Sequence, residues 1–141
     1  MENQKLCLGI LTGSIDKLTA AGIIISGAIA DDMEVEVFAL MHGARAFLKN
    51  LANDPTNLPM AENSNLRSQF ENALKQLKVN YWLDFFKQAK QMGNVKIHIC
   101  GLAGKIWGGY KLDDFVDIAD DIVGIHQYIT AIQEADVHIL I

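Results

Sequence analysis

The chain has 141 residues, a length typical of a single domain, and half of its residues are hydrophobic, which excludes an intrinsically disordered chain. Its 17 acidic and 12 basic residues give a formal net charge of −5, and the basic residues form no cluster of the kind that binds nucleic acid or an anionic membrane. The chain begins without a secretory signal, and its longest apolar run, residues 20–30, is too short to span a bilayer. We therefore expect a cytoplasmic protein that contacts neither nucleic acid nor membrane.

Hydrophobic runs alternate with glycine-containing breaks, which predicts repeated strand–helix units. Leu6–Leu11 is a continuous apolar run, typical of a strand that is buried on both faces. Residues 12–14 end this strand, and Asp16 is predicted to cap a helix that extends to about Ala30. A second strand is predicted over Glu34–Met41.

The central part of the chain contains the clearest loop signal. His42-Gly43 is expected to end the second strand, and Ala44–Leu51 is predicted to be helical. The segment Asn53–Asn63 holds both prolines of the chain and several asparagines, so we expect a loop that is mobile or closes like a lid.

The remaining elements follow from helical apolar spacing and from glycine breaks. They are a helix over 64–77 capped by Ser64, a helix over 81–92, a strand over Val95–Cys100, a short helix over 101–107, a helical turn or two over 113–119, a weak strand over 121–124, a helix over 125–134 and a last strand over 137–141. Five strands separated by helices predict one three-layer, doubly wound α/β domain around a mainly parallel sheet.

Sites in open α/β sheets lie beyond the carboxyl ends of the strands. Here those ends carry Gly13 and Ser14, His42 and Gly43, and the pair Cys100-Gly101. A glycine at such a junction permits a tight turn and a close approach of a ligand to the backbone. Gly13, Ser14 and Gly43 are therefore candidate binding residues for a small anion, although neither GxGxxG nor GxxxxGK[ST] is present.

Cys100 is the strongest candidate for chemistry because it ends a strand and begins a helix. We expect the backbone N–H groups of Gly101 and Leu102 and the helix dipole to favour a thiolate there, with Lys105 adding positive charge about one turn later. The alternative is that Cys100 is a small buried hydrophobe, as most free cysteines are, and both interpretations stay open. Cys7 lies inside an apolar run and is interpreted as structural.

The four histidines give weaker signals. His42 is positioned to carry a proton or to orient an anion, and the alternative is a capping or solvent-facing imidazole. His98 shares a strand face with Cys100 but lies lower in the sheet, so we interpret it as structural. His126 and His138 lack partners at metal-ligand spacing, and the two cysteines form neither a CxxC pair nor a disulfide framework. We expect no metal and no cofactor.

The pattern resembles the DsrE/DsrF-like family of sulfur-relay proteins, in particular its branch that is often labelled peroxiredoxin-like. Four segments carry the resemblance: Thr12–Lys17 after the first strand, Glu34–Phe38, Val95–Cys100 and Ala135–Ile141. It implies a parallel-sheet fold, homo-oligomers, a sulfur-carrying cysteine at Cys100, and small sulfur-carrier proteins and sulfurtransferases as partners. Relatives of that branch have a methionine-rich stretch where Gly101–Trp107 stands here.

Together these features predict a thiol-based sulfur carrier or sulfurtransferase-like protein that holds sulfane sulfur on Cys100, with His42 and Lys105 handling charge or protons. Its partners would be sulfur donors and acceptor thiols. The alternative function is a non-catalytic module that binds a small anion or nucleotide at Gly13, Ser14 and Gly43 and assembles into oligomers.

Overall fold

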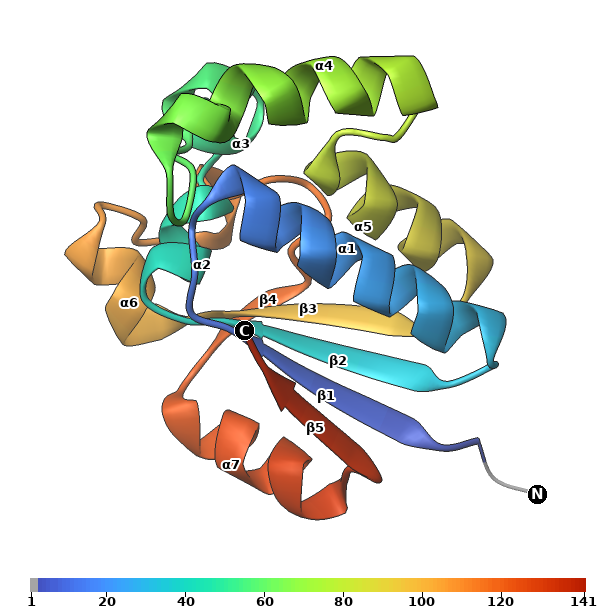
Figure 1. Cartoon of the computed structure of the whole chain (residues 1–141). Coiled ribbons are helices and arrows are strands. Elements are labelled where there is room, and N and C mark those ends of the chain that lie inside the picture. The colour runs from blue at the N-terminus through green and yellow to red at the C-terminus, as the bar shows by residue number, and fades with distance from the viewer. Residues whose placement is uncertain (1–2) are drawn as a thin grey trace.

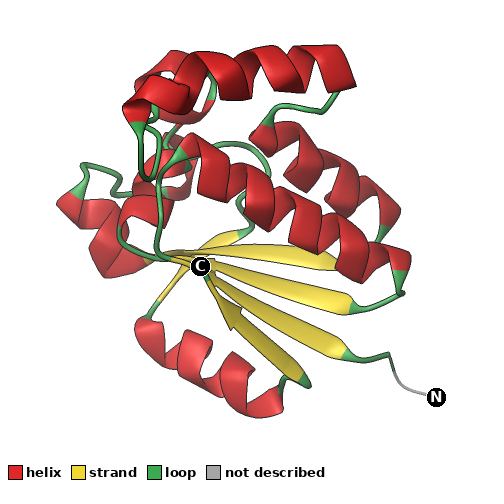
Figure 2. Cartoon of the chain, viewed as in Figure 1, coloured by secondary structure: helices red, strands yellow, loops and turns green. Residues whose placement is uncertain are grey.

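The computed structural model describes residues 3–141 as a five-stranded parallel sheet with helices on both faces (Figures 1 and 2). The strands lie in the order β4-β3-β2-β1-β5 and are β1 (Lys5–Ile10), β2 (Glu34–Ala39), β3 (Val95–Cys100), β4 (Asp121–Val123) and β5 (Val137–Leu140). The helices are α1 (Ile15–Ala30), α2 (His42–Ala46), α3 (Lys49–Ala52), α4 (Arg67–Leu77), α5 (Trp82–Met92), α6 (Gly101–Ile106) and α7 (Ile125–Glu134). The predicted α/β fold is confirmed, and the structure adds the strand order.

The two faces of the sheet are covered unequally. Helices α1 and α5 pack side by side over one face, whereas α7 lies on the other face (Figure 1). Because β4 and β5 form opposite edges of the sheet, the connection between them has to cross beneath the whole sheet. Helix α7 makes that crossing and packs against β1. On this face of the sheet, the part formed by β3 is therefore only partly covered by α7.

The burial pattern of each strand reflects this unequal coverage. In β1, every residue after Lys5 is buried, as expected for a strand covered on both faces. In β3, alternate residues from Val95 to Ile99 are buried in the main core under α1 and α5. The residues between them, from Lys96 to Cys100, point to the opposite face and are exposed or half-buried.

The start of α1 differs from the prediction. Ser14, and not Asp16, is the residue that precedes the helix, and its hydroxyl lies 3.0 Å from the Thr12 hydroxyl. Asp16 lies in the first turn, where its carboxylate accepts a hydrogen bond from the Ala61 backbone N–H at 3.0 Å. The carboxylate still favours the helix electrostatically, because it lies near the positive end of the helix dipole.

The region after β2 also differs. The strand ends at Ala39, and His42 begins α2 instead of ending the strand. The predicted helix over 44–51 is divided in two because Leu48 is extended and forms an isolated bridge with Phe115. The same bridge explains why residues 113–119 form only one 3-10 turn, Leu112–Asp114, before the chain becomes extended.

Ser64 does not cap the fourth helix. It begins a 3-10 turn whose N–H groups are capped by the Asn63 side chain, and α4 starts at Arg67. The preceding loop, residues 53–63, is attached to the start of α1. Leu58 is buried in the main core, and the Ile15 N–H donates to the Pro59 carbonyl at 2.8 Å. None of the helices within residues 3–141 is long and apolar enough to cross a membrane.

Gly43 provides a test of how tightly the carboxyl end of the sheet is packed. A Cβ at this position would lie 2.1 Å from the Ile10 carbonyl oxygen, so Gly43→Ala forces a backbone shift. We expect a loss of about 2–3 kcal/mol in the free energy of unfolding, measured by urea denaturation.

Gly27→Ala in α1 is the matched control, because a Cβ there has no neighbour within 4 Å. Removing a helix-interior glycine should stabilise the protein by about 0.5–1 kcal/mol. Equal effects of the two substitutions would contradict the packing described for Gly43.

Candidate functional site

Cys100 is the last residue of β3, opposite Val123 of β4, and it immediately precedes α6. Its side chain is half-buried and packs against both hydrophobic clusters of the protein, the main core and the smaller cluster beneath α7. That smaller cluster comprises Cys7, Phe38, Leu40, Val123, Tyr128 and Ala131. The thiol is thus held by apolar contacts on the face of the sheet that α7 only partly covers.

The residues that follow Cys100 form a helix of only six residues. Cys100 has extended backbone angles at the N-cap, and in this structure its side chain accepts no hydrogen bond from the first turn of α6. Gly101 fits against β4, because a Cβ there would lie 3.3 Å from Ile122. The Leu102 side chain is 71% exposed, and Lys105 lies in the last turn of α6. The first turn of α6 therefore presents backbone N–H groups and an apolar side chain at the cysteine.

His42 packs against Trp107, which follows α6. The two rings lie 4.9 Å apart, and the Arg45 guanidinium lies 5.7 Å from the centre of the Trp107 ring. The Trp107 indole N–H donates to the Met41 carbonyl at 2.9 Å, which fixes a residue whose φ of 42° is unfavourable for a side chain other than glycine. Sequence analysis missed this contact, because nothing in the sequence pairs residue 42 with residue 107.

The glycine junctions after β1 and β2 contact each other. A Cβ on Gly13 would lie 2.7 Å from the His42 carbonyl oxygen, so the two loops meet backbone to backbone. The Gly43 N–H donates to the Leu40 carbonyl at 2.8 Å, and Ser14 is buried with its hydroxyl beside that of Thr12. The glycines thus allow the two loops to pack closely against each other.

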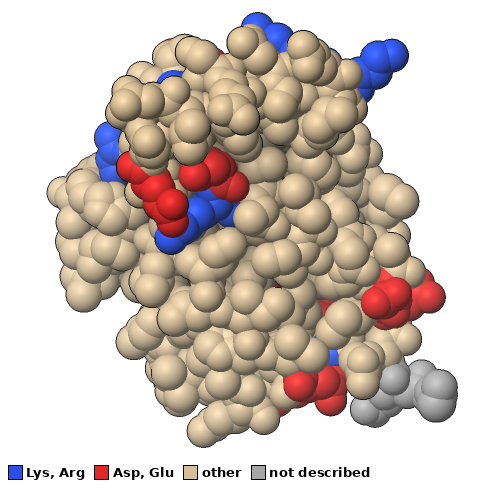
Figure 3. Space-filling model, viewed as in Figure 1, with Lys and Arg blue, Asp and Glu red and all other residues tan. Residues whose placement is uncertain are grey.

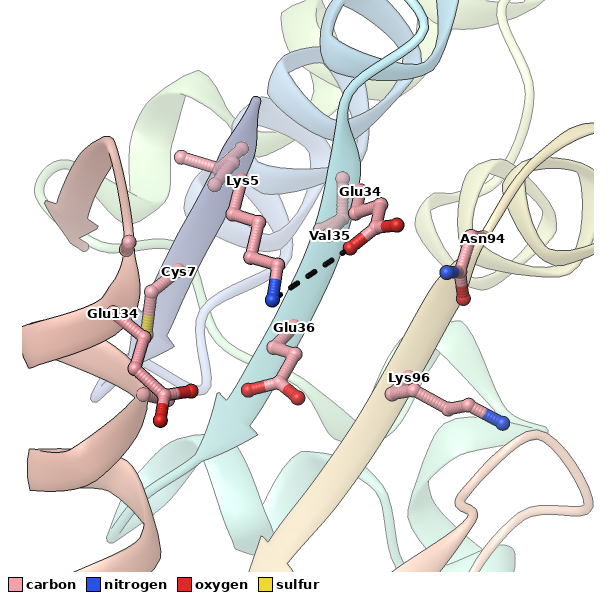
Figure 4. Close-up of a pocket in the computed structure, with 11 residues that line it drawn as sticks. Lys5, Cys7, Glu34, Val35, Glu36, Asn94, Lys96 and Glu134 are labelled. Carbon is pink, nitrogen blue, oxygen red and sulfur yellow. Dashed lines mark ion pairs between the residues drawn. The ribbon is translucent and has the colours of Figure 1, made fainter. Parts of the chain in front are cut away.

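Cys7 is buried, as predicted, and lies beside a hollow at the amino end of the strands. This hollow has a volume of about 200 Å³ and is bordered by Lys5 and Glu34, whose charged groups are 3.9 Å apart (Figure 4). Burial, reinforced by the charge of Glu36, raises the pKa of the Cys7 thiol from its ordinary 9.0 to about 11. Cys7 is therefore protonated at neutral pH and is a poor nucleophile.

His98 lies two residues before Cys100 on the same face of β3, as its position in the sequence predicts. Its Nδ1 is 2.5 Å from Asp121 Oδ1 of β4, and its Nε2 is 3.9 Å from Glu36 Oε1 of β2. The ring also packs against Phe38, with centroids 4.6 Å apart. Strand alternation could identify the face of His98, but the pairing with Asp121 depends on the strand order.

Helices α6 and α7 both carry exposed apolar side chains. They are Leu102 and Ile106 on α6 and Ile125 and Ile129 on α7. On the face drawn in Figure 3, Lys and Arg side chains are few and form no continuous basic stripe. Within residues 3–141, no three His, Cys, Asp or Glu side chains come together in a way that could hold a metal ion.

Comparison with protein families gives a match to the model of the DsrE/DsrF-like family over residues 16–140, which is nearly the whole chain. The chain belongs to the DsrE/DsrF-like family. This membership confirms the resemblance seen in the sequence and associates the protein with sulfur relay in general. No curated protein matches the chain.

The fold is similar to that of a solved protein of unknown function from Methanobacterium thermoautotrophicum. The TM-score is 0.60 at 13% sequence identity, and the match covers 99% of this chain and 100% of that one. At this sequence identity the similarity concerns the fold alone. The two proteins share that fold over nearly the full length of both chains.

The raised pKa of Cys7 predicts a loss of stability at alkaline pH. The unfolded thiol ionises near pH 9.0, whereas the folded thiol keeps its proton to about pH 11, so the free energy of unfolding falls as the pH rises through this interval. Below the interval both states are protonated and Cys7 contributes no pH dependence.

Urea denaturation of wild type and Cys7→Ala across this range should show a shallower pH dependence for the variant. Parallel curves for the two proteins would show that Cys7 is not the group responsible.

Proposed function

We propose that this protein is a sulfur carrier that holds sulfane sulfur as a persulfide on Cys100. The observation that carries the proposal is the position of a half-buried thiol at the carboxyl end of a central strand, in a chain of the DsrE/DsrF-like family. The other thiol, Cys7, is buried and has a raised pKa, which leaves Cys100 as the nucleophile.

The loading step is a nucleophilic displacement at sulfur. The Cys100 thiolate attacks the terminal sulfur of a donor R–S–SH, a new S–S bond forms on Cys100, and the donor S–S bond breaks to release R–S⁻. With a thiosulfonate donor the leaving group is a sulfinate. No external oxidant is required in either case, because one S–S or S–SO₂ bond is exchanged for another.

The groups next to Cys100 suit a persulfide whose outer sulfur carries a negative charge. The backbone N–H groups of Gly101 and Leu102 begin α6, and they would stabilise the outer persulfide sulfur as an anion. His42 and Lys105 are assigned supporting roles in charge and proton handling at the same end of the sheet. Both are exposed and therefore accessible to a donor.

Donor and acceptor are proposed to be proteins or small molecules that bring a thiol to this surface. The exposed apolar side chains of α6 and the start of α7 offer a contact area for a sulfur-carrier protein, a sulfurtransferase or a further copy of the chain. We propose that the protein acts as a homo-oligomer in the cytoplasm.

The alternative of an anion- or nucleotide-binding module receives less support from the geometry. It requires a free surface at Gly13, Ser14 and Gly43, and there the backbone of one loop contacts the other. Sulfur transfer is therefore the function that the structure supports best.

Mass spectrometry of the intact protein tests the carrier role. After incubation with a polysulfide or thiosulfonate donor, wild type and Cys7→Ser should gain a sulfur adduct that a reductant removes, and Cys100→Ser should gain none. Cys7→Ser is the matched control, because it removes the second thiol by the same substitution.

Equal loading of the two serine variants, or no loading of folded wild type, would overturn the assignment of Cys100.

A further inference from the structure

Three neighbouring side chains fix the position of the His98 imidazole on the face of the sheet that α7 only partly covers. Its Nδ1 contacts Asp121 at 2.5 Å, its ring packs against Phe38, and its Nε2 faces Glu36 at 3.9 Å. The side chain retains 13% exposure, so the imidazole is fixed in place but still reachable from solvent.

The carboxylate of Asp121 determines which nitrogen of His98 is free. A carboxylate accepts hydrogen bonds, so Nδ1 carries the proton and donates it to Asp121. Nε2 then presents a lone pair that can take a proton from an incoming thiol. This is the arrangement that a general base needs.

A groove of about 360 Å³ runs between α7 and this part of the sheet. His98 and Phe38 line it from the strands, and His126 and Gln127 line it from α7. Phe38 also belongs to the small cluster against which Cys100 packs, and Cys100 follows the groove-lining His98 by two residues on the same face of β3. A molecule lying in the groove therefore lies on the same face as the reactive sulfur.

The distance between His98 and Cys100 along β3 can be compared with the reach of a persulfide. Cα atoms two residues apart on a strand are separated by about 6.7 Å. The outer sulfur of a persulfide extends about 2 Å beyond the cysteine sulfur, which leaves room for an acceptor sulfur between it and the imidazole. A role of His98 in sulfur transfer therefore requires no direct contact between His98 and Cys100.

We propose that His98, oriented by Asp121, is the general base for discharge of sulfur from Cys100 to an acceptor thiol that enters along this groove. The inference rests on the carrier function proposed above and adds the step that completes it. It also replaces the interpretation of His98 as structural.

The discharge step is balanced without a further reactant. The acceptor R–SH gives its proton to His98 Nε2, and the resulting thiolate attacks the outer sulfur of Cys100–S–SH. The S–S bond breaks with its electron pair on the Cys100 sulfur, and R–S–SH leaves. The imidazolium then releases its proton to water, and the Cys100 thiolate is ready for the next loading step.

Several charged groups share the groove with His98 and set its electrostatic environment. Glu36 of β2 and Glu134 of α7 line the groove, and Asp121 of β4 contacts the His98 ring. Lys96 lies two residues before His98 on β3 and lines the neighbouring hollow drawn in Figure 4. His126 faces the groove from α7. Because carboxylates predominate, an uncharged or cationic thiol is the acceptor that suits this groove.

The experiment compares two acceptors that differ in their need for a base. Protein preloaded on Cys100 is discharged with 2-mercaptoethanol, whose thiol must lose a proton, or with sulfite, which carries no thiol proton and leaves as thiosulfate. Loss of the sulfur adduct is followed by intact mass. We expect His98→Asn to slow discharge to the thiol at neutral pH by about 100-fold and to leave discharge to sulfite unchanged.

Two further variants separate a chemical role from a structural one. Asp121→Asn keeps the imidazole but removes the carboxylate, and it should slow thiol discharge selectively as well. His126→Asn removes another imidazole from the same groove and should have no effect. In His98→Asn the thiol rate should rise about tenfold per pH unit below the acceptor pKa, because thiolate must then come from solution, whereas the wild-type rate should rise less steeply.

An unchanged thiol rate in His98→Asn, or equal slowing with both acceptors, would overturn the role of His98 while leaving the carrier function intact. Failure of wild type to load sulfur would instead remove the carrier function, and this inference with it. A urea denaturation midpoint close to that of wild type shows that each variant is folded.

Discussion

The crossing of α7 beneath the sheet is the constraint on which the candidate site depends. The strand order places β4 and β5 at opposite edges of the sheet, so the ten-residue helix α7 crosses from one edge to the other. Among the helices described, it alone covers its face of the sheet, whereas α1 and α5 together cover the opposite face. Hydrophobic burial is therefore complete on one face and incomplete on the other. His98 and Cys100 of β3 lie on the face that is incompletely covered.

The same asymmetry separates the chemistry of the two cysteines. Cys7 and Cys100 point to the same face, but Cys7 is on β1, which α7 covers, and Cys100 is at the end of β3, which α7 does not fully cover. Desolvation raises the pKa of Cys7 and keeps its thiol protonated. Coverage by a single helix thus decides which thiol in the protein is available for reaction.

Most of the fold could be predicted from the sequence, because apolar periodicity and glycine breaks report local structure directly. All five strands were found, and the errors lie where a distant contact decides. Leu48 is extended because it pairs with Phe115, and this pairing divides one predicted helix and shortens another. No local pattern carries that information, since the two residues are far apart in the chain.

The candidate site was predictable only in part, for the same reason. Cys100 follows from its place between a strand and a helix, but the partner of His98 follows from the pairing of β3 with β4. The role of the glycines also required the structure. In the fold Gly13 and Gly43 allow two loops to touch, a contact that no local pattern in the sequence reports.

The contact between Trp107 and His42 gives the protein an optical probe of its own. The chain has two tryptophans, and Trp82 is buried whereas Trp107 is partly exposed and packs against an imidazole. Their fluorescence therefore reports different surroundings, a dry interior for Trp82 and the carboxyl edge of the sheet for Trp107. Because α6 joins Cys100 directly to Trp107, the emission of Trp107 can follow events at the thiol in real time without a label.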